Sequence, residues 1–288
     1  IEELEKTTLM LTPEEDQFTP MLTRLRPKAK SSQALKFEWN ETDTDGTFSG
    51  SLYDGYTLPT ANTSSPSRED NYIMPLSRVA KVSKFTNSFG LVDTDAMTNE
   101  MRDRYIELKR SVEYYIWNGN ETITSPVQQT KGIKRFVTTA VSNATTLGSA
   151  QVLQEATLKE AIAQMYAEGI VPRIICATPP VASTIADFSL NNGQAHGNNL
   201  NGVPQTAFTY RSPFGFALEV VPVLEDFLGT SATGEVYILD DTNISLRYPV
   251  KERGIMNSEP LAITQHGQST IIYSFMGVQV KKASKMRK

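Results

Sequence analysis

Few side chains in this sequence have the type and spacing that chemistry at an active site requires. His196 lies in a loop rich in asparagine and glycine, with no cysteine, aspartate or glutamate close enough in sequence to suggest a metal site. His266 lies between a glutamine and a glycine. Both histidines are interpreted as surface residues rather than as ligands or general bases. Cys176 is the single cysteine and lies in an apolar run, which favours a small buried residue over a nucleophile.

Two acidic patterns resemble cation sites or carboxylate pairs. Glu41–Gly46 carries acidic residues at alternate positions before a glycine, as at the start of an EF-hand loop. The twelfth position of that loop would be Leu52, where calcium needs a bidentate glutamate, so a solvated acidic loop is the better interpretation. Asp240-Asp241 is interpreted as an acidic turn between two strands. The phosphate-binding and hydrolase motifs GxxxxGK[ST], GxGxxG and GxSxG do not occur. The sequence therefore predicts no catalytic, cofactor-binding or metal-binding residue, and no cofactor.

Composition and charge exclude several other classes of protein. The chain has 288 residues, of which 39% are hydrophobic and 21% charged, and its net charge is −4. These values are ordinary for a globular protein, and no apolar run is long enough to cross a membrane. Five Asn-x-Ser/Thr sequons are weak evidence for secretion in a chain that cannot form an internal disulfide, so an intracellular origin fits better. Two basic clusters are interpreted as solvated charges or ion-pair partners rather than as DNA-binding sites. Their members are Arg24, Arg26, Lys28 and Lys30, and Lys281, Lys282, Lys285, Arg287 and Lys288.

The first 90 residues predict segments that cannot form a core of their own. Residues 1–32 show no sustained hydrophobic period and carry three prolines, which indicates an extended arm. Ala34–Trp39 alternates with Leu35, Phe37 and Trp39 on one side, as in a half-buried strand. A long polar stretch, Glu41–Asp70, separates it from a second predicted strand at Val79–Phe85. Together they predict an extended hairpin whose few large apolar residues must pack on another molecule.

The strongest helix signal covers Asp95–Trp117. One apolar stripe runs along it, and the opposite face is charged and includes Glu113. Gly119 is expected to end the helix in the left-handed conformation. The stripe consists of Met101, Tyr105, Leu108, Val112 and Tyr115.

The second half alternates helices and strands. A capping box at Thr157–Glu160 predicts a helix that ends before Gly169, and Pro179-Pro180 begins another after a buried strand at Arg173–Ala177. Asn191–Gly202 and Gly229–Gly234 are predicted loops. Further strands are predicted at Phe216–Val223, Glu235–Leu239, Ile244–Tyr248 and Thr270–Lys282, the last with a bulge at Met276-Gly277.

The order of these elements and several local sequences resemble the major capsid proteins of tailed bacteriophages, which have the Hong Kong 97-type fold. The resemblance covers nearly the whole chain, and it rests on order and spacing rather than on one motif. The matching segments are Phe18–Leu25, Ala34–Trp39, Glu107–Tyr114, Lys131–Ile133, Val236–Asp241, Leu246–Tyr248 and Glu259–Ala262.

The resemblance implies an α+β fold and five regions. They would be an N-terminal arm (1–33), an E-loop hairpin (34–90), a spine helix with the first part of the P-domain (91–149), an A-domain (150–248) and the rest of the P-domain (249–288). It further implies a structural protein of the virion that assembles with itself into hexamers and pentamers of an icosahedral head around double-stranded DNA. Portal, scaffolding and decoration proteins would be further partners. Contact with the packaged DNA would be non-specific.

Three alternatives remain open from the sequence. An encapsulin-like nanocompartment shell protein would share the fold. An α/β enzyme is disfavoured by the two isolated histidines, and a secreted adhesin is supported by the sequons alone.

Overall fold

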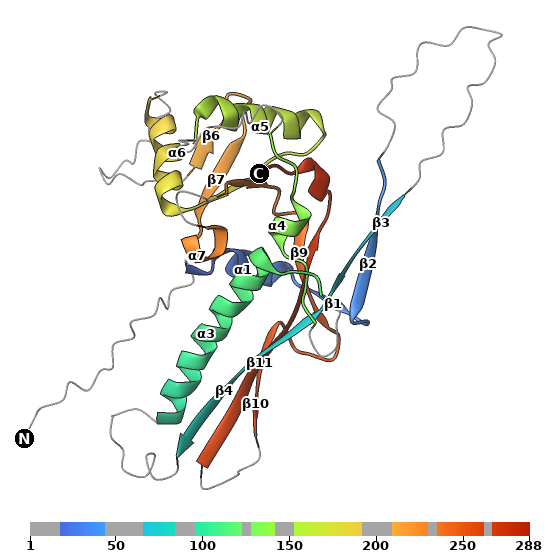
Figure 1. Cartoon of the computed structure of the whole chain (residues 1–288), viewed down its shortest axis with the longest axis vertical. Helices are drawn as coiled ribbons and strands as arrows, with labels where there is room; N and C mark the ends of the chain where they lie inside the picture. The colour runs from blue at the N-terminus through green and yellow to red at the C-terminus, as the bar shows by residue number, and fades with distance from the viewer. Residues whose placement is uncertain are drawn as a thin grey trace, which may run out of the picture.

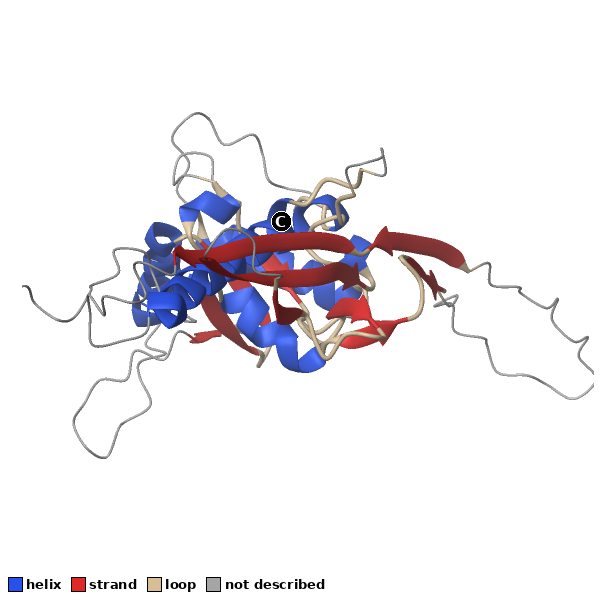
Figure 2. Cartoon of the chain, turned by 90° about the horizontal axis from the view of Figure 1, so that it is seen from below, coloured by secondary structure: helices blue, strands red, loops and turns tan. Residues whose placement is uncertain are grey.

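The computed structural model of the chain describes eight stretches of residues and mixes helices with strands. Figure 2 shows the long strands crossing the middle of the molecule, with helices above and below them. No helix in these stretches is both long and apolar enough to cross a membrane. The described residues are 18–43, 66–83, 96–122, 128–141, 153–191, 209–229, 235–261 and 267–288.

One long strand organises the larger sheet, which we call the β11 sheet. Strand β11 (Gly267–Val280) runs antiparallel to β4 (Met74–Ser83) and, on its other side, to β10 (Met256–Pro260) (Figure 1). The end of β11 pairs with β9 (Ile244–Pro249), and β1 (Lys30–Ser32) adds to β9 in parallel.

The predicted bulge at Met276-Gly277 is wrong, and a change of pairing partner stands in its place. Met276 is the last residue of β11 opposite β4, and Gly277 is the first opposite β9. From Ile271 to Met276 the residues of β11 alternate in burial, whereas from Met276 to Val280 every residue is buried. The hydrophobic phase therefore shifts because both faces of the strand become covered.

The predicted long helix is confirmed as α3 (Ala96–Asn118), which lies along β4 and β11 (Figure 1). Leu108 and Val112 of the predicted stripe are buried, and Ile106, Ile116 and Trp117 extend it. Gly119 ends the helix for a different reason than expected, because its φ is not positive. A Cβ at Gly119 would lie 2.2 Å from the carbonyl oxygen of Thr130, so the position needs glycine for close backbone approach.

The hairpin forms, but with a different second strand. Strand β2 (Lys36–Glu41) pairs with β3 (Ser67–Tyr72), and the predicted partner Val79–Phe85 falls partly in β4. Strand β3 was missed because its sequence, SREDNY, is almost wholly polar. Its exposed face is held to β2 by charge: Lys36 Nζ lies 2.7 Å from Asp70 Oδ2. The alternating pattern predicts a buried Leu35, and this is wrong: Leu35 precedes the strand and is 50% exposed.

The described part of the predicted arm is folded, so the expectation of an extended segment is wrong for residues 18–32. Helix α1 (Pro20–Leu25) and a 3₁₀ turn, η2 (Arg26–Lys28), precede β1. Met21, Leu22 and Leu25 are buried in the main core. A helix of fewer than two turns is too short to give a recognisable period. The first 17 residues lie outside the described residues.

The second sheet, the β5 sheet, has the strand order β6-β7-β5-β8 and mixes parallel and antiparallel pairs. The two predicted helices beside it, α5 and α6, are confirmed, and Gly169 (φ +80°) follows α5 as expected. The capping box is wrong, because the N-cap of α5 is Gln154 and makes no side-chain capping bond. The elements are α5 (Glu155–Ala167), β5 (Ile174–Ala177), α6 (Pro179–Asn191), β6 (Thr209–Arg211), β7 (Ala217–Pro222), α7 (Glu225–Leu228) and β8 (Tyr237–Leu239).

A single buried cluster joins the two sheets. The ring of Trp117 from α3 lies 5.6 Å from the ring of Tyr237 from β8, centroid to centroid. Two short helices, α4 (Ile133–Phe136) and the 3₁₀ helix η3 (Ala283–Lys285), complete the described structure. The residues of the predicted loops Asn191–Gly202 and Gly229–Gly234 lie outside it, apart from Asn191 and Gly229 at their edges.

We predict that Gly277→Ala loosens the contact between the hairpin and β11. The added Cβ would lie 2.5 Å from Phe37 Cε1 and 2.9 Å from the carbonyl oxygen of Tyr72, which cannot move without moving β3. We expect the free energy of unfolding, measured in urea, to fall by about 1–3 kcal/mol, as for other overpacked cores. Gly254→Ala is the control, since its Cβ would meet nothing within 4 Å. Equal losses for the two variants would contradict the prediction.

Candidate assembly site and the contacts that position it

A buried carboxylate holds the N-terminal helix on the long helix. Glu113 of α3 is fully buried, and its Oε2 accepts a hydrogen bond from the backbone N–H of Leu22 at 2.7 Å. Its Oε1 accepts bonds from Met21 N at 3.2 Å and Trp117 Nε1 at 3.1 Å. The first-turn N–H groups of a helix lack partners within that helix, and α1 has no side-chain cap of its own. Glu113 therefore supplies the missing cap from another element.

Burial makes Glu113 unusual electrostatically. Desolvation raises its pKa to about 7, although the hydrogen bonds from Leu22, Trp117 and Met21 act in the opposite direction. The prediction that Glu113 lies on the polar face of the helix is wrong. Periodicity alone cannot identify a charged side chain that is buried because a distant segment supplies its donors.

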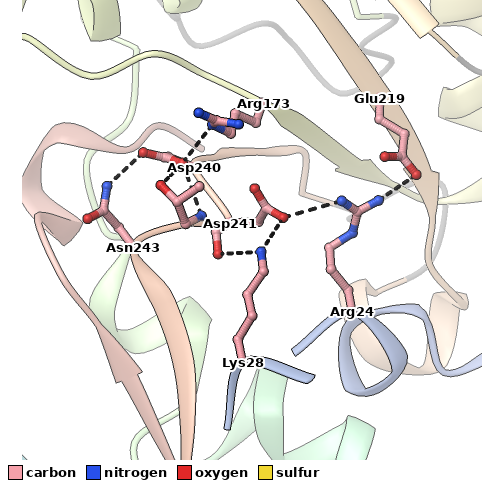
Figure 3. A network of polar contacts seen from close by, with 8 residues as sticks. Arg24, Lys28, Arg173, Glu219, Asp240, Asp241 and Asn243 are labelled. Atoms are coloured by element: carbon pink, nitrogen blue, oxygen red, sulfur yellow. Dashed lines mark hydrogen bonds and ion pairs between the residues drawn. The ribbon is translucent and has the colours of Figure 1, made fainter. Parts of the chain in front are cut away.

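The acidic turn is confirmed at Asp240-Asp241, and both carboxylates are buried rather than solvated (Figure 3). Asp241 Oδ2 accepts hydrogen bonds from Lys28 Nζ at 2.7 Å and from Arg24 Nη1 at 3.3 Å. Burial acts to raise the pKa of Asp241, but the hydrogen bonds and charges of Lys28 and Arg24 outweigh it and hold the pKa below its ordinary value. Arg24 also pairs with Glu219 of β7 at 2.5 Å.

Asp240 has a local role in the same network. Its Oδ1 accepts bonds from the backbone N–H of Thr242 at 3.1 Å and from the hydroxyl of Thr242 at 2.6 Å. Its Oδ2 accepts a bond from Asn243 Nδ2 at 2.6 Å. These contacts close the turn between β8 and β9 and leave Asp241 facing the N-terminal segment (Figure 3).

The interpretation of the basic clusters as ion-pair partners is confirmed for several members. Arg24 and Lys28 bind Asp241, as described above. At the C-terminus, Arg287 pairs with Glu168, Lys288 with Glu235 at 3.2 Å, and Lys285 with Asp43 at 2.6 Å. Arg26 and Lys30 are exposed.

A buried amide fixes the root of the hairpin, and nothing in the sequence marked it. The side chain of Asn71 is fully buried between β3, Lys131 and β11. Its Nδ2 donates to the carbonyl oxygens of Lys131 (3.0 Å) and Val278 (2.5 Å). Its Oδ1 accepts from the N–H groups of Lys131 and Tyr72, both at 2.8 Å. All of the amide's hydrogen-bonding capacity is thus used at this position.

Of the residues considered for chemistry, those that the structure describes do not form a metal or catalytic cluster. Cys176 is fully buried in β5, and desolvation raises the pKa of its thiol well above the usual range. His196, His266, Asp45 and Gly46 lie outside the described residues. In the stretches that are described, no three His, Cys, Asp or Glu side chains are arranged to hold a metal ion.

The described surface carries exposed apolar side chains and a groove that another protein could contact. Tyr114, Val79 and Val250 expose about half of their surfaces (43%, 47% and 53%). Tyr114 and Arg78 also line a groove of about 460 Å³ between α3, β4 and α7. Tyrosine and arginine side chains are enriched at protein–protein interfaces. Meanwhile β2 and β3 point away from the two sheets (Figure 1).

Solved structures with the same arrangement of elements identify the fold. The capsid of a native GTA particle superimposes with a TM-score of 0.64 at 15% identity, covering 100% of this chain and 94% of that one. The cyanophage A-1(L) capsid gives 0.66 at 11% identity, with 98% and 94% covered. The SrpI encapsulin of Synechococcus elongatus PCC 7942 gives 0.61 at 12%, with 98% and 90% covered. The fold is therefore the Hong Kong 97-type fold of shell proteins, as the sequence suggested.

The family follows from the sequence model that matches the chain. Residues 2–287 match the model of the SU10 major capsid protein, and the chain belongs to that family. A comparison with curated protein sequences finds no match. The chain is accordingly a capsid protein of the virion that assembles with copies of itself. The likeness to encapsulin shows the shared fold alone.

We predict that Glu113 makes stability fall as pH rises. Its pKa is about 7 in the folded chain and near 4.5 when unfolded, so the folded state holds the extra proton between these values. The contribution is fully present below about pH 4.5 and is lost as pH rises through about 7, a change of about 3 kcal/mol.

Glu113→Gln isolates this effect because the other titrating groups cancel in the difference. In urea unfolding of the unassembled chain between pH 4 and 8, the wild type should lose stability relative to the variant as pH rises. Parallel curves for the two proteins would show that Glu113 does not titrate in this range.

We predict that Asp241→Asn weakens the attachment of the N-terminal segment. Asp241 is 10% exposed and pairs with two cations, so its replacement should cost about 1–3 kcal/mol in the free energy of unfolding. Asp226→Asn is the matched control: Asp226 is 73% exposed and lies 3.5 Å from Arg110. It should cost less than about 0.5 kcal/mol. A larger loss for Asp226→Asn than for Asp241→Asn would overturn the assignment.

Proposed function

We propose that this chain forms hexamers and pentamers that close into an icosahedral phage head around double-stranded DNA. The role is structural, and no chemistry is assigned to any residue. The domain boundaries given above, from the arm at 1–33 to the last part of the P-domain at 249–288, belong to the same proposal. The family membership supports it, and the described surface is consistent with repeated contact between copies.

The observation that carries the proposal is the hairpin. A two-stranded sheet is marginally stable by itself in water. Here β2 and β3 contact the body through Phe37, Trp39 and Asn71, and their other face carries the charged pairs Lys36–Asp70 and Arg68–Glu38. A segment built in this way gains its remaining contacts from a neighbouring molecule. Obligate interfaces of roughly 2,000–5,000 Å² are large enough to offset the cost of ordering it.

Further partners follow from the role. The ring of each capsomer would use heterologous contacts that close by rotation, and many modest contacts would make the shell persistent. Contact with DNA would be non-specific and dependent on salt, because basic side chains would neutralise backbone phosphates. It would involve few basic groups, because several cations are already engaged in ion pairs. Portal, scaffolding and decoration proteins would bind the assembled lattice.

A shortened hairpin tests the proposal. Glu41 lies opposite Ser67, so an Asn-Gly turn replacing residues 42–66 would close β2 and β3 with a two-residue loop. Electron microscopy should show closed shells for the wild type and none for the shortened chain, with both proteins equally resistant to urea. Normal shells from the shortened chain, or wild-type chains that remain monomeric at every concentration and salt, would contradict the proposal.

A further inference from the structure

We propose that the C-terminal strap, Lys281–Lys288, is the positioning element that fixes the direction of the hairpin relative to the β5 sheet within one subunit. The strap follows β11 directly and makes contacts at both of its ends. One end meets the outer part of β2, and the other is anchored on α5 and β8. Its importance for assembly rests on the proposed function, but the strap itself is a property of the single chain.

The strap meets the hairpin at the carboxylate of Glu41, which accepts hydrogen bonds from both segments. Glu41 Oε1 accepts a hydrogen bond from Trp39 Nε1 at 2.9 Å and another from the backbone N–H of Lys282 at 2.8 Å. The carboxylate therefore links a buried aromatic side chain of β2 to the first turn of the strap. The nearby pair of Lys285 and Asp43 adds little, because Asp43 is 81% exposed.

The backbone at this contact is under strain. Lys282 has a φ of +53°, and among the described residues no other non-glycine residue has a positive φ. The left-handed conformation is unfavourable for a residue with a Cβ. A strained residue persists where the structure on both sides over-determines it. Here the donation from Lys282 to Glu41 and the anchoring of the following residues provide that constraint.

The far end of the strap is buried. The Met286 side chain is fully buried and the Arg287 side chain is 5% exposed, which is unusual for an arginine. The Arg287 guanidinium pairs with Glu168 and donates from Nε to Gln164 Oε1 at 3.2 Å, both at the end of α5 or beside it. Its backbone bridges Ile238 of β8, with Ile238 N donating to Arg287 O at 3.0 Å.

A contact far from the root restricts the direction of the hairpin, because a hairpin held at its root alone could rotate about that point. Phe37 meets Gly277 of β11 at the root of the hairpin. Glu41 meets the strap four residues further along, about 13 Å away for an extended strand. The hairpin is thereby held beyond its root as well as at it, and this outer contact is tied to the β5 sheet. A subunit that presents its hairpin in one direction avoids part of the ordering cost when it meets a neighbour.

Distances between spin labels test the strap in the unassembled full-length chain. Asn40→Cys on the hairpin and Ala156→Cys on α5 are both exposed, while Cys176 is buried and stays unlabelled. Glu41→Ala should broaden the distribution of distances about twofold, because local opening becomes easier when a hydrogen bond to a charged acceptor is lost. Glu38→Ala removes the same charge from the same strand without touching the strap, and should leave the width unchanged. Lys282→Gly keeps the N–H and should also leave it unchanged.

The same width for Glu41→Ala and the wild type would overturn the proposal. Labelling of Cys176 would reveal a variant that fails to fold, and in that case hydrogen exchange of the wild type decides. The amide of Lys282 should be protected and should exchange at the rate of the β2 amides; free exchange at Lys282 would reject the strap. Neither measurement depends on shell formation, so failure of the proposed function and failure of the strap are separate results.

Discussion

The pairing of β11 is the constraint on which the rest of the structure depends. Because the strand passes from β4 to β9 at Met276–Gly277, one continuous segment of backbone touches the long helix, the hairpin root and the N-terminal segment through β9 and β1. The absence of a side chain at Gly277 lets Phe37 and Tyr72 approach the strand closely. The same strand then continues into the C-terminal strap. The position of the hairpin's root is therefore set by the sheet rather than by the hairpin's own two strands.

Two carboxylates hold the N-terminal segment, and their surroundings shift their pKa values in opposite directions. Glu113 receives neutral N–H donors in a fully buried place, so desolvation dominates and its pKa rises. Asp241 is also buried, yet Lys28 and Arg24 supply opposite charge, and its pKa falls. A buried carboxylate without a cationic partner costs stability when ionised, whereas attraction to paired cations offsets part of that cost. Glu113 thus fixes the orientation of α1 by capping its first turn. Asp241 strengthens the binding of the N-terminal segment through its ion pairs with Arg24 and Lys28.

The sequence predicted elements with a strong local pattern and missed those that depend on distant partners. The stripe around Leu108 and Val112 identified α3, and the apolar run around Cys176 identified β5. In both elements the local order of apolar and polar residues shows which faces are buried. Strand β3 and helix α1 carry no such pattern: β3 is polar, and α1 is too short to show a period. Glu113, Asn71 and Arg287 were missed for one shared reason. Their burial is compensated by donors or acceptors from segments far along the chain, such as Leu22, Val278 and Glu168.

Both ends of the described chain carry cations that carboxylates elsewhere in the chain bind. The pairs are Arg24 and Lys28 with Asp241, Arg24 with Glu219, Lys285 with Asp43, Arg287 with Glu168, and Lys288 with Glu235. Exposed pairs such as that of Asp43 weaken in salt, whereas the pairs of Asp241 and Arg287 are shielded from it by burial. Salt that screens a shell's contact with its cargo would therefore leave the ends of each subunit attached. The main role of these basic residues is therefore to hold the ends of the chain on the folded subunit, rather than to contact the cargo.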